Sequence, residues 1–107
     1  MSNLKNLTIV IVTYKTNEDI LNNCLNSIDR EVQIKVIENS PEKESHISLI
    51  NKRDNLSIYY TGKNLGYGGG NNFGFNFVET DYVIVANPDI IFHKTFFENI
   101  KKYLDST

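Results

Sequence analysis

The chain has 107 residues, about the length of one domain, of which 40% are hydrophobic and 22% charged, with a net charge of -2. This composition supports one hydrophobic core and excludes both a disordered chain and the strongly basic surface of a nucleic-acid-binding protein. No apolar run approaches the roughly 18 residues of a membrane span. Residues 1–6 lack the apolar core of a secretion signal, and a single cysteine makes neither an internal disulfide nor a zinc site. We therefore expect a cytoplasmic α/β domain.

The first predicted strand is residues 7–12, a β-branched run that suits a strand covered on both faces of a parallel sheet. Apolar residues then recur at helical spacing over 20–28, which predicts a helix with Thr16 or Asn17 as its N-cap. Cys24 lies on the apolar side of this helix. We interpret it as a core residue and not as a nucleophile.

The second predicted strand is residues 34–37. Ser40 and Pro41 follow it and fit the N-cap and first position of a helix that runs to about Lys52. A third strand is predicted at 56–60, where apolar and aromatic residues return.

Residues 62–74 are rich in glycine and predict turns, while apolar residues at 73–78 predict a helix that begins within this stretch. A fourth strand is predicted at 82–86. Thr95 and Glu98 then form a capping box before a last helix. Strands and helices alternate along the whole chain, which predicts a parallel sheet with right-handed crossovers.

In a parallel sheet, every loop that leads from a strand into a helix lies at the same edge, where ligands bind. In this chain those loops are 13–15, 38–40, 63–72 and 87–89. All four are polar, acidic or rich in glycine. The sequence therefore predicts one ligand-binding edge to which all four loops contribute.

The most unusual loop holds four of the six glycines within 66–70, flanked by asparagines that suit contacts with sugar hydroxyls. Glycine lets the backbone approach a ligand closely, and N–H groups at the start of a helix favour phosphate. A flexible surface loop is the alternative interpretation. The segment is neither a P-loop nor a dinucleotide fingerprint, because Lys63 precedes the glycines and the segment follows the third strand.

Two carboxylates follow predicted strands. Asp89 suits Mg²⁺ or Mn²⁺, because such ions are held by one or two carboxylates together with phosphate oxygens. Residues 87–89 can equally be a simple turn. Glu38 can accept hydrogen bonds from a ribose hydroxyl or a base N–H, or it can cap the next helix.

Taken together, the segments 9–14, 36–40, 64–72 and 86–89 resemble the nucleotide-sugar-binding half of a family 2 inverting glycosyltransferase. The similarity is greatest to the rhamnosyltransferase-like branch, in which the asparagine-glycine loop occurs with an Asn-Pro-Asp form of the D-x-D motif. The resemblance covers residues 7–104. It implies the Rossmann-like half of the GT-A fold, with a mainly parallel four-stranded sheet in the order 3-2-1-4 and helices on both faces.

The resemblance also implies a reaction. A sugar would be transferred with inversion from a nucleoside-diphosphate sugar, of the dTDP-rhamnose or UDP-sugar type, to a glycan or lipid-linked acceptor. Such transfer belongs to polysaccharide or cell-surface glycan synthesis, in the cytoplasm or at the inner face of the membrane.

The same resemblance assigns roles to individual residues. Asp89 would ligate Mg²⁺ or Mn²⁺, and Thr13 and Tyr14 would line the base pocket. Glu38 stands where the family commonly has Asp and would contact the base or ribose. The residues assigned to the nucleotide sugar are Thr13, Tyr14, Glu38, Asn39, Asn64, Gly66, Gly68, Gly69, Gly70, Asn71 and Asn87.

No residue resembles the catalytic base, which in the family lies beyond the metal motif in the acceptor half. We therefore expect residues 1–107 to be a single nucleotide-sugar-binding domain of a truncated glycosyltransferase, which binds its donor weakly, does not turn over alone and self-associates through bared apolar surface. A non-catalytic nucleotide-binding module is the main alternative. A nucleotidyltransferase would need glycine in 13–17, and a structural domain would not respond to nucleotide.

Overall fold

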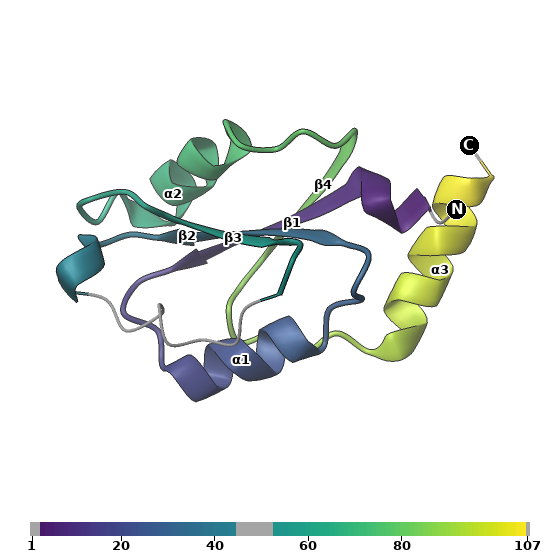
Figure 1. Cartoon of the computed structure of the whole chain (residues 1–107), viewed down its shortest axis with the longest axis horizontal. Coiled ribbons are helices and arrows are strands. Elements are labelled where there is room, and N and C mark those ends of the chain that lie inside the picture. The colour runs from purple at the N-terminus through teal and green to yellow at the C-terminus, as the bar shows by residue number, and fades with distance from the viewer. Residues whose placement is uncertain (1–2, 45–52, 107) are drawn as a thin grey trace.

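The computed structural model describes residues 3–44 and 53–106 (Figure 1). Four parallel strands form its sheet in the order β3-β2-β1-β4, as predicted. The strands are β1 (Leu7–Thr13), β2 (Gln33–Glu38), β3 (Leu56–Tyr60) and β4 (Tyr82–Ala86). All seven residues of β1 are buried, because this strand lies inside the sheet and is covered on both faces. Burial on both faces explains why the sequence of β1 is almost continuously apolar.

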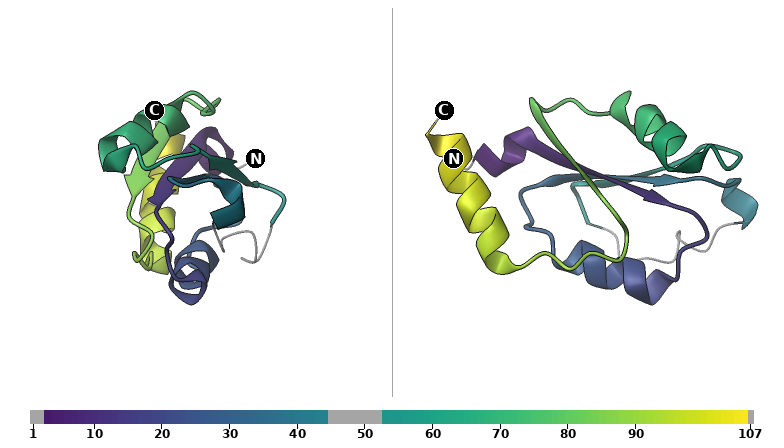
Figure 2. Two further views of the ribbon diagram at one scale, coloured as in Figure 1. Left: turned by 90° about the vertical axis from the view of Figure 1, so that its left-hand side faces the viewer. Right: turned by 180° about the vertical axis from the view of Figure 1, so that it is seen from behind.

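Helices cover both faces of the sheet, also as predicted. Helix α1 (Glu18–Asn26) lies on one face and α2 (Gly66–Phe75) on the other (Figure 1). Helix α3 (Lys94–Asp105) lies at one end of the molecule, beside the short 3₁₀ helix η1 (Asn3–Asn6). The two ends of the described chain are therefore close together (Figure 2), and Asn3 Nδ2 donates a hydrogen bond to Asp105 Oδ1 at 2.8 Å.

The core has two parts, one on each face of the sheet. Alternate residues of a strand point to opposite faces, so Ile9 and Ile11 pack on the α1 side while Val10 and Val12 pack on the α2 side. The α2 side also contains Tyr59, whose ring stacks on that of Phe77 with centroids 3.8 Å apart. The predicted burial of Cys24 is confirmed, since it has no exposed surface.

Both ends of α1 are satisfied by side chains. Asn17 is the N-cap, as predicted, and its side chain accepts hydrogen bonds from Asp19 N and Ile20 N. At the other end the Arg53 guanidinium donates to three backbone carbonyls, at distances of 2.8–3.1 Å. These carbonyls belong to Leu25, Ile28 and Asp29. Leu25 is in the last turn of α1, where a charged donor supplies a hydrogen bond to a carbonyl at the helix end, and Ile28 and Asp29 belong to the segment that follows the helix.

Two predicted helix starts were wrong. Ser40 does not cap a helix; its hydroxyl donates to Glu38, and only the short 3₁₀ helix η2 (Glu42–Glu44) follows. The rest of that predicted helix lies outside the described residues. Helix α3 begins one residue before Thr95 and is capped by His93, whose Nδ1 accepts from Thr95 N at 3.2 Å.

The glycine-rich stretch predicted as turns is mostly helix, because α2 begins at Gly66. The reason is close packing against the sheet. A Cβ added to Gly70 would lie 2.7 Å from Val12 Cγ1, and one added to Gly74 would lie 2.9 Å from Ile37 Cγ1. The low helix propensity of glycine is therefore offset by an approach to the sheet that no larger residue permits.

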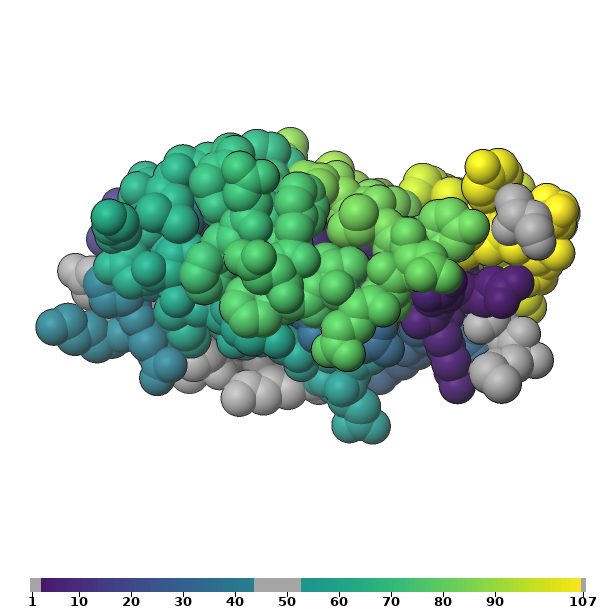
Figure 3. Space-filling view, turned by 90° about the horizontal axis from the view of Figure 1, so that it is seen from above, coloured from purple at the N-terminus to yellow at the C-terminus, as the bar shows by residue number. Residues whose placement is uncertain are grey.

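Strand β4 forms one edge of the sheet and is poorly covered. Val83 and Val85 pair in register with Thr8 and Val10, so they point toward the α2 side, yet they remain 44% and 39% exposed. Figure 3 shows this face, with η1 and α3 at one end of the molecule. Within the described part of the chain, no helix is long and apolar enough to cross a membrane.

Candidate functional site

A cavity of about 280 Å³ lies at the carboxyl ends of β1, β2 and β3. It brings together three of the predicted site residues, Tyr14, Asn39 and Asn64, from three different loops. The sequence interpretation gave the other lining residues no individual role, although Lys15, Ser40 and Lys63 lie in the loops predicted to form the ligand-binding edge. The full lining is Tyr14, Lys15, Asn39, Ser40, Pro41, Gly62, Lys63 and Asn64.

The cavity has a cationic and aromatic character. Tyr14 is 51% exposed, so its ring is free to stack against a planar group. The Lys15 ammonium lies 5.4 Å from the centroid of this ring, and Lys63 supplies a second positive charge. Two lysines beside an exposed aromatic ring suit an anionic ligand that also carries a ring.

Glu38 lies beneath the cavity and is fully buried. Its carboxylate accepts hydrogen bonds from Thr13 Oγ1 at 2.6 Å, from Lys15 N at 3.1 Å and from Ser40 Oγ. Lys15 has a φ of 51°, a conformation that residues other than glycine rarely adopt. The buried carboxylate therefore holds the cavity loops in place from inside.

Asn39 ties three strands to the start of α2. Its backbone N–H donates to Thr13 O at 2.8 Å and its side-chain Nδ2 donates to Gly66 O at 2.9 Å. Its Oδ1 accepts from Thr61 Oγ1 at 3.1 Å, just beyond β3. Both polar atoms of this side chain are engaged within the protein, so Asn39 fixes the shape of the cavity wall.

The predicted glycines divide into two groups. Gly66 has a φ of 76° and its N–H is held by Asn64 Oδ1 at 2.8 Å; nothing lies within 4 Å of where its Cβ would be. Gly68 is equally open. Gly69 and Gly70 are closely packed, since a Cβ there would lie 2.8 Å from Leu65 Cβ or 2.7 Å from Val12 Cγ1. Only the first group leaves open space for a ligand beside the backbone, although the N–H and C=O of Gly66 are already bonded to Asn64 and Asn39.

The loop after β4 does not line this cavity. Asn87 and Asp89 are exposed, and their turn is held against α1, where Cys24 Sγ donates to Asn87 O at 3.9 Å and Phe92 N donates to Ser27 Oγ at 2.9 Å. In residues 3–44 and 53–106, no group of three His, Cys, Asp or Glu side chains forms a metal-binding cluster. A metal at Asp89 would need ligands from a bound molecule.

Cys24, below this turn, has a structural role. Burial of the thiol, with a further contribution from the negative charge of Asp89, raises its pKa from 9.0 to about 11. Nucleophilic cysteines need the opposite shift, because the thiolate is the reactive form. The interpretation of Cys24 as a core residue is confirmed.

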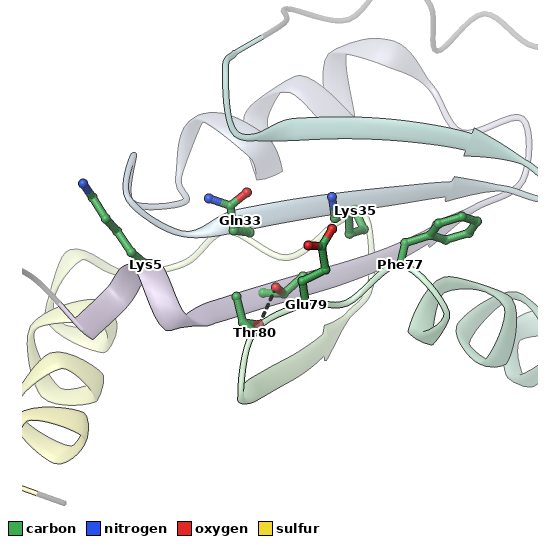
Figure 4. A pocket seen from close by; sticks show the side chains of 7 residues that line it. Lys5, Gln33, Lys35, Phe77, Glu79 and Thr80 are labelled. Carbon is green, nitrogen blue, oxygen red and sulfur yellow. Dashed lines mark hydrogen bonds between the residues drawn. The ribbon is translucent and has the colours of Figure 1, made fainter.

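A second hollow, of about 220 Å³, lies at the opposite edge of the sheet (Figure 4). Its lining includes Lys35 and Glu79, and a hydrogen bond of 2.6 Å joins Thr8 Oγ1 to Thr80 Oγ1. This hollow lies at the amino ends of β1 and β2. Ligands of parallel α/β sheets bind at the carboxyl ends, so the 280 Å³ cavity is the candidate site.

A parallel 3-2-1-4 sheet between helices, with a polar cavity at the carboxyl ends of its strands, defines a Rossmann-like domain of the GT-A type. Comparison with known proteins identifies the family. The sequence pattern of Glycosyl transferase family 2 matches residues 8–107. The chain therefore belongs to glycosyl transferase family 2.

Two of the similar proteins illustrate the likeness. The chain is 34% identical over 95 residues to the low-salt glycan biosynthesis hexosyltransferase Agl10 of Haloferax volcanii, a match that covers 85% of this chain and 30% of that protein. The fold of this chain also matches the crystal structure of S. aureus TarS 1-349, with a TM-score of 0.72 and 18% sequence identity. The match covers 94% of this chain and 32% of that chain. The second likeness concerns the fold alone. The chain thus spans about a third of the length of these relatives.

Proposed function

We propose that this chain is the donor-binding domain of an inverting glycosyltransferase of the rhamnosyltransferase-like branch. Its donor is a nucleoside-diphosphate sugar of the dTDP-rhamnose or UDP-sugar type, and the acceptor is a glycan or lipid-linked glycan in polysaccharide synthesis. We place the reaction in the cytoplasm or at the inner face of the membrane. The observation that carries the proposal is the cavity of Tyr14, Lys15, Asn39 and Lys63 in a chain of this family.

In this proposal the nucleotide enters the cavity base first. The exposed Tyr14 ring stacks on the base, and the Lys15 and Lys63 ammonium groups attract the diphosphate. The open space beside Gly66 and Gly68 leaves room for the same ligand at the start of α2. These cations also stabilise the negative charge that develops on the leaving nucleoside diphosphate.

The proposed metal ligand is Asp89, with Asn87 beside it. Both are exposed at the end of β4, and one carboxylate completed by phosphate oxygens is a donor set that Mg²⁺ or Mn²⁺ accepts. When bound, such an ion supplies positive charge to the diphosphate leaving group.

Transfer also requires a base that removes the proton of the acceptor hydroxyl. We assign that base to an acceptor-binding part outside residues 1–107, together with recognition of the acceptor. Residues 1–107 then act as a donor-binding domain only. We accordingly expect the chain to bind the nucleotide and to transfer no sugar alone.

Asp89→Ala tests the metal part of the proposal. We expect the chain to bind UDP or dTDP more tightly with Mn²⁺ than without it, and the substitution to abolish that difference because the only protein carboxylate on the ion is lost. The measurement is isothermal titration calorimetry of both nucleotides, with and without Mn²⁺. Asp54→Ala is the matched control, because Asp54 is an exposed aspartate in the turn two residues before β3, away from the cavity.

Binding that is indifferent to Mn²⁺ would favour the non-catalytic nucleotide-binding module. The absence of any binding, by calorimetry and by thermal stability, would contradict both functions. The second readout is sensitive, since a ligand at 100 times its dissociation constant adds about 2.7 kcal/mol to the stability of the folded state.

We further propose that a second copy of the chain covers β4. An uncharged edge strand with unpaired backbone groups pairs readily with another such strand, and Val83 and Val85 add exposed apolar surface. We expect light scattering to give a dimer and Val85→Lys to give a monomer. Tyr103→Lys, at a residue 62% exposed on α3, is the control. A monomeric wild type would contradict this part of the proposal.

A further inference from the structure

Asn71 carries the one side-chain polar atom among the described residues that is buried without a hydrogen-bond partner. The residue is only 7% exposed, and the atom is Oδ1 of its amide. Buried acceptors in folded proteins are nearly always paired, and leaving one unpaired costs about 1–3 kcal/mol. An atom that is tolerated at such a cost points to a partner that arrives from outside the protein.

The position of Asn71 on α2 places this atom beside the candidate site. Its neighbour Gly70 packs on Val12 at the end of β1, and a Cβ there would lie 2.9 Å from Asn39 Nδ2, in the cavity wall. Asn71 is therefore at the level of the strand ends, within two turns of the start of α2 at Gly66.

The side of α2 on which Asn71 lies follows from helical geometry. The ring centroids of Phe73 and Phe77 are 5.4 Å apart, and the Phe77 ring stacks on Tyr59 of β3. Phe73 is therefore on the β3 side of α2. Successive residues are about 100° apart around a helix, which puts Asn71 on the opposite flank of the stripe formed by Gly70 and Gly74. This flank faces the β1 and β4 side of the sheet, between the cavity and the loop that carries Asp89.

The chemistry of the atom then selects the part of the ligand that it can bind. A carbonyl oxygen only accepts hydrogen bonds, and an ionised diphosphate offers none. The donors that a nucleotide sugar offers are the N–H of its base and the hydroxyl groups of its ribose and sugar. Tyr14 follows β1, so a base held against it lies toward the side of the sheet on which Asn71 lies. We propose that Asn71 Oδ1 is a specificity-determining acceptor for an N–H or hydroxyl donor of the nucleoside or for a hydroxyl of the donor sugar; this inference rests on the proposed function.

Asn71→Leu separates this role from a structural one. Leucine has a similar volume and removes the unpaired acceptor, so we expect the ligand-free chain to melt at a higher temperature than the wild type. We expect its affinity for UDP-glucose to fall about tenfold, the effect of losing about 1.4 kcal/mol of binding, while its affinity for pyrophosphate is unchanged. Thermal unfolding and isothermal titration calorimetry measure the two effects.

Two further variants make the comparison specific. Asn23→Leu places the same substitution at an exposed position in α1, so it measures the gain in helix propensity alone. Asn71→Ala brings no new volume and is expected to lose the same affinity. UDP distinguishes the two sources of the donor: an equal loss for UDP and UDP-glucose assigns the nucleoside, and a loss confined to UDP-glucose assigns the sugar.

The inference alone fails if the wild type binds UDP-glucose and both Asn71 variants bind it equally well, or if pyrophosphate binding falls in the same proportion. It also fails if both variants melt well below the wild type, because the amide would then be paired in the folded chain. A wild type that binds none of the three probes overturns the proposed function, and this inference with it.

Discussion

Gly70→Ala is expected to lower the free energy of unfolding by about 1–3 kcal/mol, the usual effect of excess volume in a packed core, whereas Gly68→Ala is expected to raise it by up to about 1 kcal/mol. Both glycines lie in α2, two positions apart. A Cβ at Gly70 would lie 2.7 Å from Cγ1 and 3.1 Å from Cγ2 of Val12, while one at Gly68 would meet nothing within 4 Å. Urea unfolding of both variants and the wild type measures the difference.

The opposite signs make this pair informative. Val12 is β-branched and lies in a buried strand, so it cannot rotate away from a new methyl group at low cost. At Gly68 the new methyl group only restricts the unfolded chain and favours helix. If the two variants changed stability in the same direction, the glycine-rich stretch would not be the closely packed helix described here.

The sheet was predictable because each strand is a buried apolar run that polar or glycine-rich loops interrupt. The burial of all seven residues of β1 and the alternation of strands with helices follow from that pattern. The resemblance to family 2 glycosyltransferases added the strand order. These features depend on composition along the chain, which a sequence displays directly.

The glycine segment could not be assigned from the sequence, because glycine is common in turns and disfavoured in helices. Its helical state depends on a tertiary fact, the close approach of Gly70 and Gly74 to two strands. The cap of α3 shows the same limit. Thr95 and Glu98 match the pattern of a capping box, yet the N-cap is His93, whose side chain accepts the hydrogen bond from the backbone N–H of Thr95.

The candidate site was predictable as an edge of the sheet and less so as a set of contacts. Loops after β1, β2 and β3 meet in one cavity, as the topology requires. The fourth loop is fixed to α1 by Cys24 and Ser27, two contacts that depend on where the helix packs. The direction of the Glu38 side chain was also open, since a carboxylate at a strand end can face a ligand or the protein interior.

That direction leads to the second large effect: Glu38→Ala is expected to lower the free energy of unfolding by about 3 kcal/mol or more. The substitution removes the common acceptor of Thr13 Oγ1, Lys15 N and Ser40 Oγ and leaves the two hydroxyls only distant carbonyl acceptors at 3.5 Å. A buried donor left unpaired costs about 1–3 kcal/mol. A domain of this length has a total stability of about 5–15 kcal/mol, so the loss is a large part of it. Urea unfolding measures the effect.

Glu98→Ala is the control, because Glu98 is exposed on α3 and surface substitutions change stability by about 0.5 kcal/mol or less. Glu38→Gln keeps the shape of the side chain and part of its accepting capacity, so it should fall between the two. If Glu38→Ala were as mild as the control, the carboxylate would not be holding the cavity loops.

A Glu38→Gln chain of unchanged stability that has lost its nucleotide affinity would instead mean that Glu38 acts on the ligand, as the resemblance to the family implies. The hydrogen bonds of the folded chain favour the first role, because they already occupy both carboxylate oxygens and hold Lys15 in its left-handed conformation.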